Sequence, residues 1–380
     1  EAPFIGDFES RNVFKADVTG LKANTFYKYR MGTEGAWSEV FYHQTSRGSA
    51  AGFSFTVVAD PQSSYSSYNT DNLNGHTEEE MYKVLDAANK FDSDNRFFLM
   101  LGDIVDEIGK RPNEVVSYTG IANKFNKERP IIATQGNHDT YRTTGDNVYV
   151  FGEATVFNAF VTFPDNGWEK PANPNRSQPY YFYYNKVLVV VLNTMATTDT
   201  NYGTSPNHDA QAAWLKDVLQ KDKDDKASNY RIVVTHISPF GGRTSERGYQ
   251  PEVRAAYGKI CTDFNVDIFF AGHDHVYGRS NPIKIDSSTS ISSLKPQFAA
   301  GTAGGVIYSV ASTAGPKYYN LDPSPDRDEY FPGERQKFGG PDQAPGMFIN
   351  VKVTSSYLTV KAVHGGSGAV IDEYNVPIKK

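Results

Sequence analysis

The chain has 380 residues, of which 39% are hydrophobic and 22% are charged, so it can form one large core together with a smaller unit. Its formal net charge of -6 argues against a nucleic-acid partner, because binding to a phosphate backbone requires an excess of Lys and Arg. Cys261 is the only cysteine, which excludes an intrachain disulfide and a cluster of thiolate ligands. No apolar run reaches the ~20 residues of a membrane-spanning helix.

The first 46 residues predict short antiparallel strands. Apolar and polar residues alternate in three runs, which cover residues 13–18, 25–31 and 39–45. The strings DVTGLKANTFYKYRMG and AWSEVFYHQT resemble the last three strands of a fibronectin type III-like sandwich, with Tyr27 as its corner tyrosine. Three strands bury too little surface to fold alone, so either upstream residues complete the sandwich, which we favour, or the strands pack on the main domain. We expect residues 1–46 to be the C-terminal part of such a β domain.

Residues 47–380 predict an α/β domain, because apolar strands alternate there with helix-like segments. Buried strands that end in polar loops are predicted at FSFTVVAD, RFFLMLGD, PIIATQGNHD, VLVVVLNT, YRIVVTHIS and VDIFFAGHDH. Helices are predicted at 76–90, which contains a capping box, and at 209–223. The tail 347–377 alternates like paired antiparallel strands, and the Pro- and Gly-rich stretch 311–346 has the length of a functional rim or lid.

Polar side chains of the types that can bind metal ions follow these strands directly. They are Asp60, Asp103, the tetrad GNHD at 136–139, His236 and the tetrad GHDH at 272–275. Sites in α/β sheets form at the carboxyl ends of strands, so we expect these side chains to converge. A mixture of carboxylate, amide and imidazole ligands suits Mn, Fe or Zn better than Ca. One Asp placed between two divalent ions could bridge them.

In this order, the motifs Asp60, GD at 102, GNHD at 136, His236 and GHDH at 272 resemble those of the calcineurin-like metallophosphoesterase superfamily. The resemblance extends from residue 52 to about residue 310. The strings WLKDVL, NVDIFFAGHDHVYGRSNP and AAGTAGG are similar to its purple acid phosphatase-like branch. The resemblance implies a four-layer α-β-β-α sandwich, here preceded by the small antiparallel β segment.

The resemblance also implies which residues bind two metal ions. Asp103 would bridge the ions. The remaining ligands would be Asp60 and His275 for the first ion, and Asn137, His236 and His273 for the second.

The resemblance places further residues around the phosphate. His138, and with it Asn137, would contact the phosphate, and His138 would stabilise the transition state or protonate the leaving oxygen. Asp139 could orient a neighbouring imidazole. His208 lies in a loop that should open near the metals, and we consider it a candidate substrate contact.

Two positions depart from the relatives. Gln62 stands where many members of the superfamily have a His two residues after the first Asp, and Asp106 stands where the purple enzymes have a Tyr that binds ferric iron. Gln62 could bind the first metal through its carbonyl oxygen, which is a weaker donor than imidazole, so this site should hold its ion more loosely. Asp106 could coordinate a metal, accept a supporting hydrogen bond or begin a helix.

The sequence therefore predicts hydrolysis of small phosphate esters by a hydroxide bound to two Mn, Fe or Zn ions, as a phosphomonoesterase of broad specificity. A phosphodiesterase acting on cyclic nucleotides or glycerophosphodiesters would use the same metals. From another class, the chain could be a cell-surface binding protein with a relic metal site, although the intact ligands argue against this. The fibronectin-like start and the near absence of Cys favour a secreted or cell-surface protein.

Overall fold

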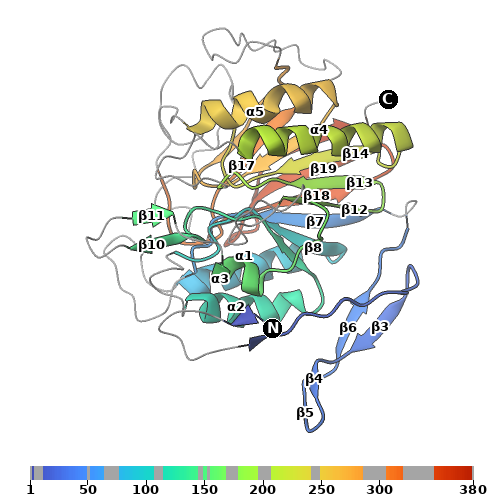
Figure 1. Cartoon of the computed structure of the whole chain (residues 1–380), viewed down its shortest axis with the longest axis vertical. Helices are drawn as coiled ribbons and strands as arrows, with labels where there is room; N and C mark the ends of the chain where they lie inside the picture. The colour runs from blue at the N-terminus through green and yellow to red at the C-terminus, as the bar shows by residue number, and fades with distance from the viewer. Residues whose placement is uncertain are drawn as a thin grey trace.

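The computed structural model of the chain describes residues 2–3, 12–48, 52–63, 77–106, 114–143, 149–151, 155–167, 179–195, 207–240, 249–285, 305–319 and 346–378. Two six-stranded sheets lie between two layers of helices (Figure 1). Helices α4 (Asn207–Asp225) and α5 (Tyr249–Asp263) form one outer layer. Helices α1 (Thr77–Phe91), α2 (Glu114–Asn126) and α3 (Thr155–Phe160) form the other. The predicted four-layer α-β-β-α architecture is confirmed.

The first sheet has the strand order β20-β19-β18-β7-β8-β9. Its parallel half contains β7 (Phe53–Val58), β8 (Asn95–Met100) and β9 (Ile131–Ala133). Its antiparallel half contains β18 (Met347–Val353), β19 (Tyr357–His364) and β20 (Val370–Pro377). β18 pairs antiparallel with β7, so the predicted C-terminal strands extend the sheet that carries the first motifs.

The second sheet has the strand order β12-β13-β14-β15-β17-β16. Four central strands run parallel: β13 (Val187–Val191), β14 (Tyr230–Val234), β15 (Ile268–Ala271) and β17 (Ile307–Ala311). The edge strands β12 (Tyr180–Tyr184) and β16 (Tyr277–Arg279) pair antiparallel with β13 and β17. Both sheets therefore present the carboxyl ends of parallel strands, where loops can carry a site.

The side chains of the central strands alternate between two hydrophobic layers. Val187 and Val189 pack between the sheets, whereas Leu188 and Val190 pack under α4 and α5. Because both faces are covered, the strand sequence is a continuous apolar run rather than an alternating one. Full burial of each such side chain contributes about 1.5–3 kcal/mol. The strands therefore form a stiff support for the loops that follow them.

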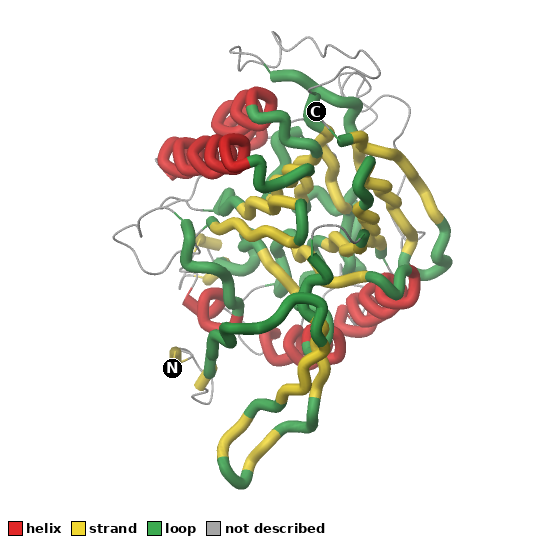
Figure 2. The backbone as a smooth tube through the Cα atoms, turned by 90° about the vertical axis from the view of Figure 1, so that its right-hand side faces the viewer, coloured by secondary structure: helices red, strands yellow, loops and turns green. Residues whose placement is uncertain are grey.

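The N-terminal segment is a narrow hairpin that extends away from the four layers (Figure 2). It consists of β3 (Phe26–Tyr29) paired with β6 (Phe41–Gln44), and of β4 (Gly32–Thr33) paired with β5 (Ala36–Trp37) at its tip. The strand expected at 13–18 is wrong: only β2 (Asn12–Val13) is extended there, and it pairs with β1 (Ala2–Pro3).

Outside this hairpin the sequence missed β10 (Tyr141–Thr143) and β11 (Tyr149–Phe151). It also did not predict the strands β16 and β17 or the helices α2 and α3. Residues 320–345 of the candidate lid lie outside the described residues. Within the described ranges, none of the helices combines the length and apolarity that crossing a membrane requires.

Candidate metal centre

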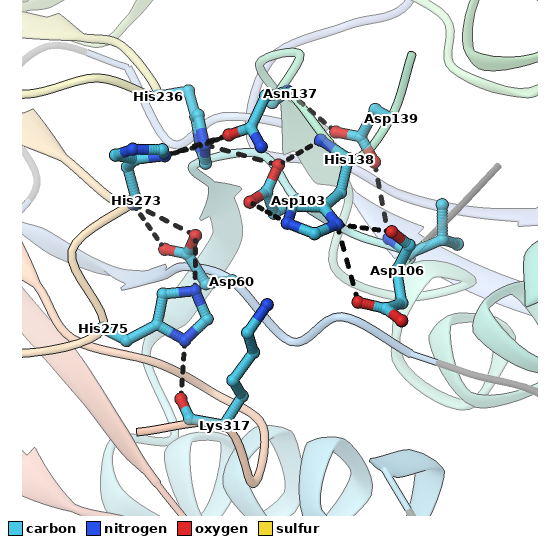
Figure 3. Close-up of polar contacts among 12 residues, drawn as sticks. Asp60, Asp103, Asp106, Asn137, His138, Asp139, His236, His273, His275 and Lys317 are labelled. Carbon is cyan, nitrogen blue, oxygen red and sulfur yellow. Dashed lines mark hydrogen bonds and ion pairs between the residues drawn. The ribbon is translucent and has the colours of Figure 1, made fainter. Parts of the chain in front are cut away.

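The predicted ligands come together at the carboxyl edge of both sheets (Figure 3). Asp60 follows β7, Asp103 follows β8 and Asn137 follows β9, all in the first sheet. The imidazoles come from the second sheet, where His236 follows β14 and the pair His273 and His275 follows β15. The site thus depends on the packing of one sheet against the other.

Three donor atoms form a compact triangle on one side of Asp103. His236 Nε2 lies 2.9 Å from Asn137 Oδ1 and 3.1 Å from His273 Nδ1, and His273 Nδ1 lies 2.9 Å from Asn137 Oδ1. Asp103 Oδ1 lies 3.3 Å from His236 Nε2. Ligand atoms bonded at about 2.1 Å to one ion lie roughly 3.0–3.4 Å apart in octahedral or tetrahedral geometry. This donor set therefore fits a transition-metal ion.

A second group of donors lies on the other side of Asp103. It combines Asp60, Asp103 and His275, whose ligand atoms all lie within 4.8 Å of one another. His275 Nε2 is 3.4 Å from Asp60 Oδ1. Since Asp103 also belongs to the group with His236 and His273, its carboxylate is the donor that two ions at this centre would share.

Main-chain carbonyls fix the orientation of the imidazoles. His236 Nδ1 donates a hydrogen bond to the Leu101 carbonyl (2.7 Å), and His275 Nδ1 donates one to the Lys317 carbonyl (2.6 Å). A carbonyl oxygen only accepts, so the proton of each neutral ring sits on Nδ1 and the lone pair of Nε2 faces the cluster. This arrangement is the usual support of metal-binding histidines.

The backbone of the site is strained and tightly packed. Asp60 and Asp103 both have φ of 49°, His273 has 72° and His275 has 50°, a left-handed conformation that costs a non-glycine residue about 1–3 kcal/mol. A Cβ at Gly136 would lie 2.2 Å from Asp103 Oδ1. The glycine of the GNHD motif is therefore needed because the neighbouring carboxylate occupies the space of a side chain.

The electrostatic environment of the centre favours a cation beside the Asp103 carboxylate. Burial acts to raise the pKa of this carboxyl, but the charges of His236 and His138 outweigh burial and hold the pKa below its usual value. Burial lowers the pKa of His236, yet the adjacent Asp103 carboxylate raises it to about 10. Burial also raises the pKa of Asp60 well above its ordinary value. A buried carboxylate that attracts cationic partners fits a role as metal ligand.

His138 lies beside the cluster, with 18% of its side chain exposed and its Nε2 3.9 Å from Asp103 Oδ2. Its Nδ1 donates to the Asp106 carbonyl and lies 3.5 Å from the Asp106 carboxylate. Nε2 is therefore the nitrogen that faces the candidate metals. The main-chain carbonyl of Asp106 thus orients His138, and the role of the Asp106 side chain stays a prediction.

The Asp139 carboxylate binds backbone amides in two loops. Its Oδ2 accepts from Gly136 N (2.8 Å), and its Oδ1 accepts from Ile104 N (3.0 Å) and Val105 N (3.4 Å). The side chain thus joins the loops after β8 and β9, which carry the Asp103 and Asn137 donors. A direct catalytic role for Asp139 stays a prediction.

Two further predicted residues are buried. Gln62 is fully buried with φ of 41°, and neither atom of its amide has a hydrogen-bond partner among the described residues. Such an orphaned amide is compatible with a ligand role. His208 is 7% exposed and its Nδ1 lies 2.7 Å from the Tyr257 hydroxyl. Its expected contact with substrate stays a prediction.

Two sheets packed between helices, with overlapping ligand groups at their carboxyl edges, define the class of α/β proteins built around a dinuclear metal centre. The family model described as calcineurin-like phosphoesterase matches residues 53–277, so the chain belongs to this family. The resemblance of the sequence motifs to the calcineurin-like superfamily is confirmed.

Several relatives are purple acid phosphatases. The chain is 26% identical over 278 residues to purple acid phosphatase 21 of Arabidopsis thaliana, covering 73% of this chain and 55% of the relative. It is 23% identical over 279 residues to a phosphoenolpyruvate phosphatase of Allium cepa, covering 72% and 52%. It thus spans about half the length of these curated relatives. The structure of a purple acid phosphatase from Lupinus luteus seeds shares the fold, with a TM-score of 0.67, 16% identity, and coverage of 95% of this chain and 61% of that chain.

Proposed function

We propose that this chain hydrolyses phosphate esters at a dinuclear metal centre and prefers phosphomonoesters. The observation that carries the proposal is the position of Asp103, whose carboxylate belongs to two groups of potential ligands at once. Two bound ions would supply a nucleophile at neutral pH and neutralise charge on the phosphoryl group. Iron, manganese and zinc all suit the mixed donor set.

The proposed role of His138 is to act on the phosphoryl group without holding a metal. Its Nε2 faces the cluster, while the Asp106 carbonyl holds Nδ1 in the protonated state. In the protonated ring, Nε2–H could donate to a phosphoryl oxygen or to the leaving oxygen. Asn137 would help to position the phosphate while binding the second ion, and Asp139 would hold the two loops in register.

The test is an assay after metal removal with a chelator and reloading with Mn, Fe or Zn. We expect turnover of p-nitrophenyl phosphate with metal, almost none without it, and slower turnover of bis(p-nitrophenyl) phosphate. A preference for the diester would overturn the monoesterase assignment and support the phosphodiesterase. Absence of turnover with every metal would overturn the enzymatic function and favour a binding protein with a relic site.

We also propose that residues 1–46 belong to a fibronectin type III-like β domain and residues 47–380 to the catalytic domain. The Tyr27 hydroxyl accepts a hydrogen bond from Lys22 N (2.8 Å), five residues upstream, which is the bond that a tyrosine corner makes. Phe26 and Tyr42 on the hairpin are 71% and 52% exposed, as expected of a face that further strands would cover. Such modules favour an exported protein at the cell surface, which detection of the protein in the cell-surface or extracellular fraction would test.

A further inference from the structure

A lysine that the sequence motifs do not include lies at the metal centre. Lys317 is in the loop after β17, at the same carboxyl edge as the candidate ligands. Figure 3 shows its side chain extending from beside His275 toward the space between Asp60, Asp103 and His138. The ammonium group therefore points to the place where a phosphate would meet the metals.

The loop that carries Lys317 is fixed to the first metal-binding loop. Thr313 Oγ1 donates to the Asp60 carbonyl (2.7 Å), and Ala314 N donates to the Ala59 carbonyl (2.7 Å). Gly315 packs against the same loop so closely that a Cβ there would lie 2.2 Å from the Pro61 carbonyl oxygen. These contacts hold the loop of Lys317 against the loop of Asp60, so the two residues keep a fixed relative position.

The main-chain carbonyl and the side-chain ammonium of Lys317 make separate contacts at the centre. Its main-chain carbonyl accepts the hydrogen bond from His275 Nδ1. Its ammonium lies 5.9 Å from the centre of the Tyr319 ring, which in turn packs 4.9 Å from the His275 ring. Substitution of the side chain removes the charge but keeps the carbonyl that orients His275.

The Lys317 charge acts on both sides of the site. Burial is the main cause that lowers the pKa values of His138 and His275, and the positive charge of Lys317 lowers both further. Within the described part of the chain, no carboxylate lies within ion-pair distance of its ammonium. A phosphate bound at the metal ions would place its phosphoryl oxygens near this ammonium, where they could accept a charge-assisted hydrogen bond.

We propose that the Lys317 ammonium binds a non-bridging phosphoryl oxygen and thereby selects dianionic phosphomonoesters over monoanionic phosphodiesters. This inference rests on the proposed phosphate-ester hydrolysis. A monoester carries two negative charges near neutral pH, whereas a diester carries one and has an ester group where the second charge would be. The additional cation therefore stabilises the bound monoester more than the bound diester.

The variant that tests this role is Lys317→Met, which keeps the length of the side chain and removes its charge. We expect kcat/KM for p-nitrophenyl phosphate to fall about 10- to 100-fold, as for loss of a charged hydrogen bond, and that for bis(p-nitrophenyl) phosphate to fall less than about 3-fold. Lys317→Arg should recover part of the monoester activity. Lys361→Met is the matched control, because Lys361 of β19 pairs with Glu373 of β20 (3.4 Å), and it should change neither rate.

A binding measurement separates this inference from the proposed function. Calorimetry of the metal-loaded protein should show weaker binding of inorganic phosphate to Lys317→Met than to the wild type, at equal metal content. Equal losses for monoester and diester, an unchanged phosphate affinity, or loss of metal from Lys317→Met would each overturn the role of Lys317. If the wild type hydrolyses neither ester, the proposed function fails, and the phosphate affinities still decide whether Lys317 binds the anion.

Discussion

Replacement of Asp139 should destabilise the fold through the loops that it joins. In Asp139→Ala, the strong acceptors for Ile104 N and Gly136 N disappear, and both amides lie in a buried site. An unsatisfied buried donor costs about 1–3 kcal/mol, so the two together cost roughly 2–6 kcal/mol. Asp139→Asn keeps one acceptor oxygen, so its free energy of unfolding should fall by about half as much. Native proteins are stable by only about 5–15 kcal/mol, so the Ala variant should unfold at a clearly lower urea concentration.

The assay combines urea unfolding with metal content and turnover. Asp225→Asn is the control, because Asp225 is an exposed residue that pairs with Lys221 (2.8 Å) at the end of α4, and such a pair contributes less than about 1 kcal/mol. We expect the loss of metal and activity in the Asp139 variants to follow the loss of stability. Wild-type stability in Asp139→Ala would refute this reasoning. Full stability and metal content in Asp139→Asn, together with no turnover, would instead make Asp139 a catalytic residue.

Asp103→Asn should nearly abolish turnover and weaken the binding of both metals, whereas Asn137→Ala should weaken the binding of mainly one. If the Asp103→Asn variant stays active and binds two ions tightly, Asp103 is not a bridging ligand. His138→Ala should lower turnover by about 10²- to 10⁴-fold with both metals retained, and metal loss in proportion to activity would make His138 a ligand. Gln62→His should retain the first metal more tightly in chelator competition, because imidazole is a stronger donor than an amide oxygen; unchanged retention would argue against Gln62 as a ligand. Iron-loaded protein should lack a purple tyrosinate band, since Asp106 stands in the tyrosine position, and a strong visible band would contradict this.

Much of the fold could be predicted because the strands have a simple signature. The strands β13 and β15 are buried on both faces, so they are continuous apolar runs that lead into polar motifs, and β7 is equally buried although it contains Ser54 and Thr56. The strand expected at 13–18 was wrong because the apolar residues of this segment are not buried. Phe14 and Val18 alternate with polar residues as in a strand, but they are 77% and 72% exposed, and alternation alone does not supply a partner strand.

The convergence of the candidate donors could also be predicted, but the contacts that orient them could not. His236 and His275 follow recognisable motifs, whereas the carbonyls of Leu101 and Lys317 that orient them carry no side-chain signal. Lys317 lies in a stretch considered only as part of a rim, and no spacing rule connects it to the motifs. Its place at the centre follows from the parallel pairing of β15 with β17 and from the contacts of its loop with the Asp60 loop. Such long-range contacts exist only in the folded chain.

The strained backbone at the metal centre indicates that the fold orients the ligands before a metal ion binds. Asp60, Asp103, His273 and His275 all have positive φ, and at about 1–3 kcal/mol each their combined strain is comparable to the net stability of a domain. The strands on either side, buried on both faces, hold these residues in place. A centre formed in this way has its ligands oriented before a metal or phosphate arrives, so less of the binding free energy is lost in ordering the loops. The strain is therefore the expected consequence of a preorganised site.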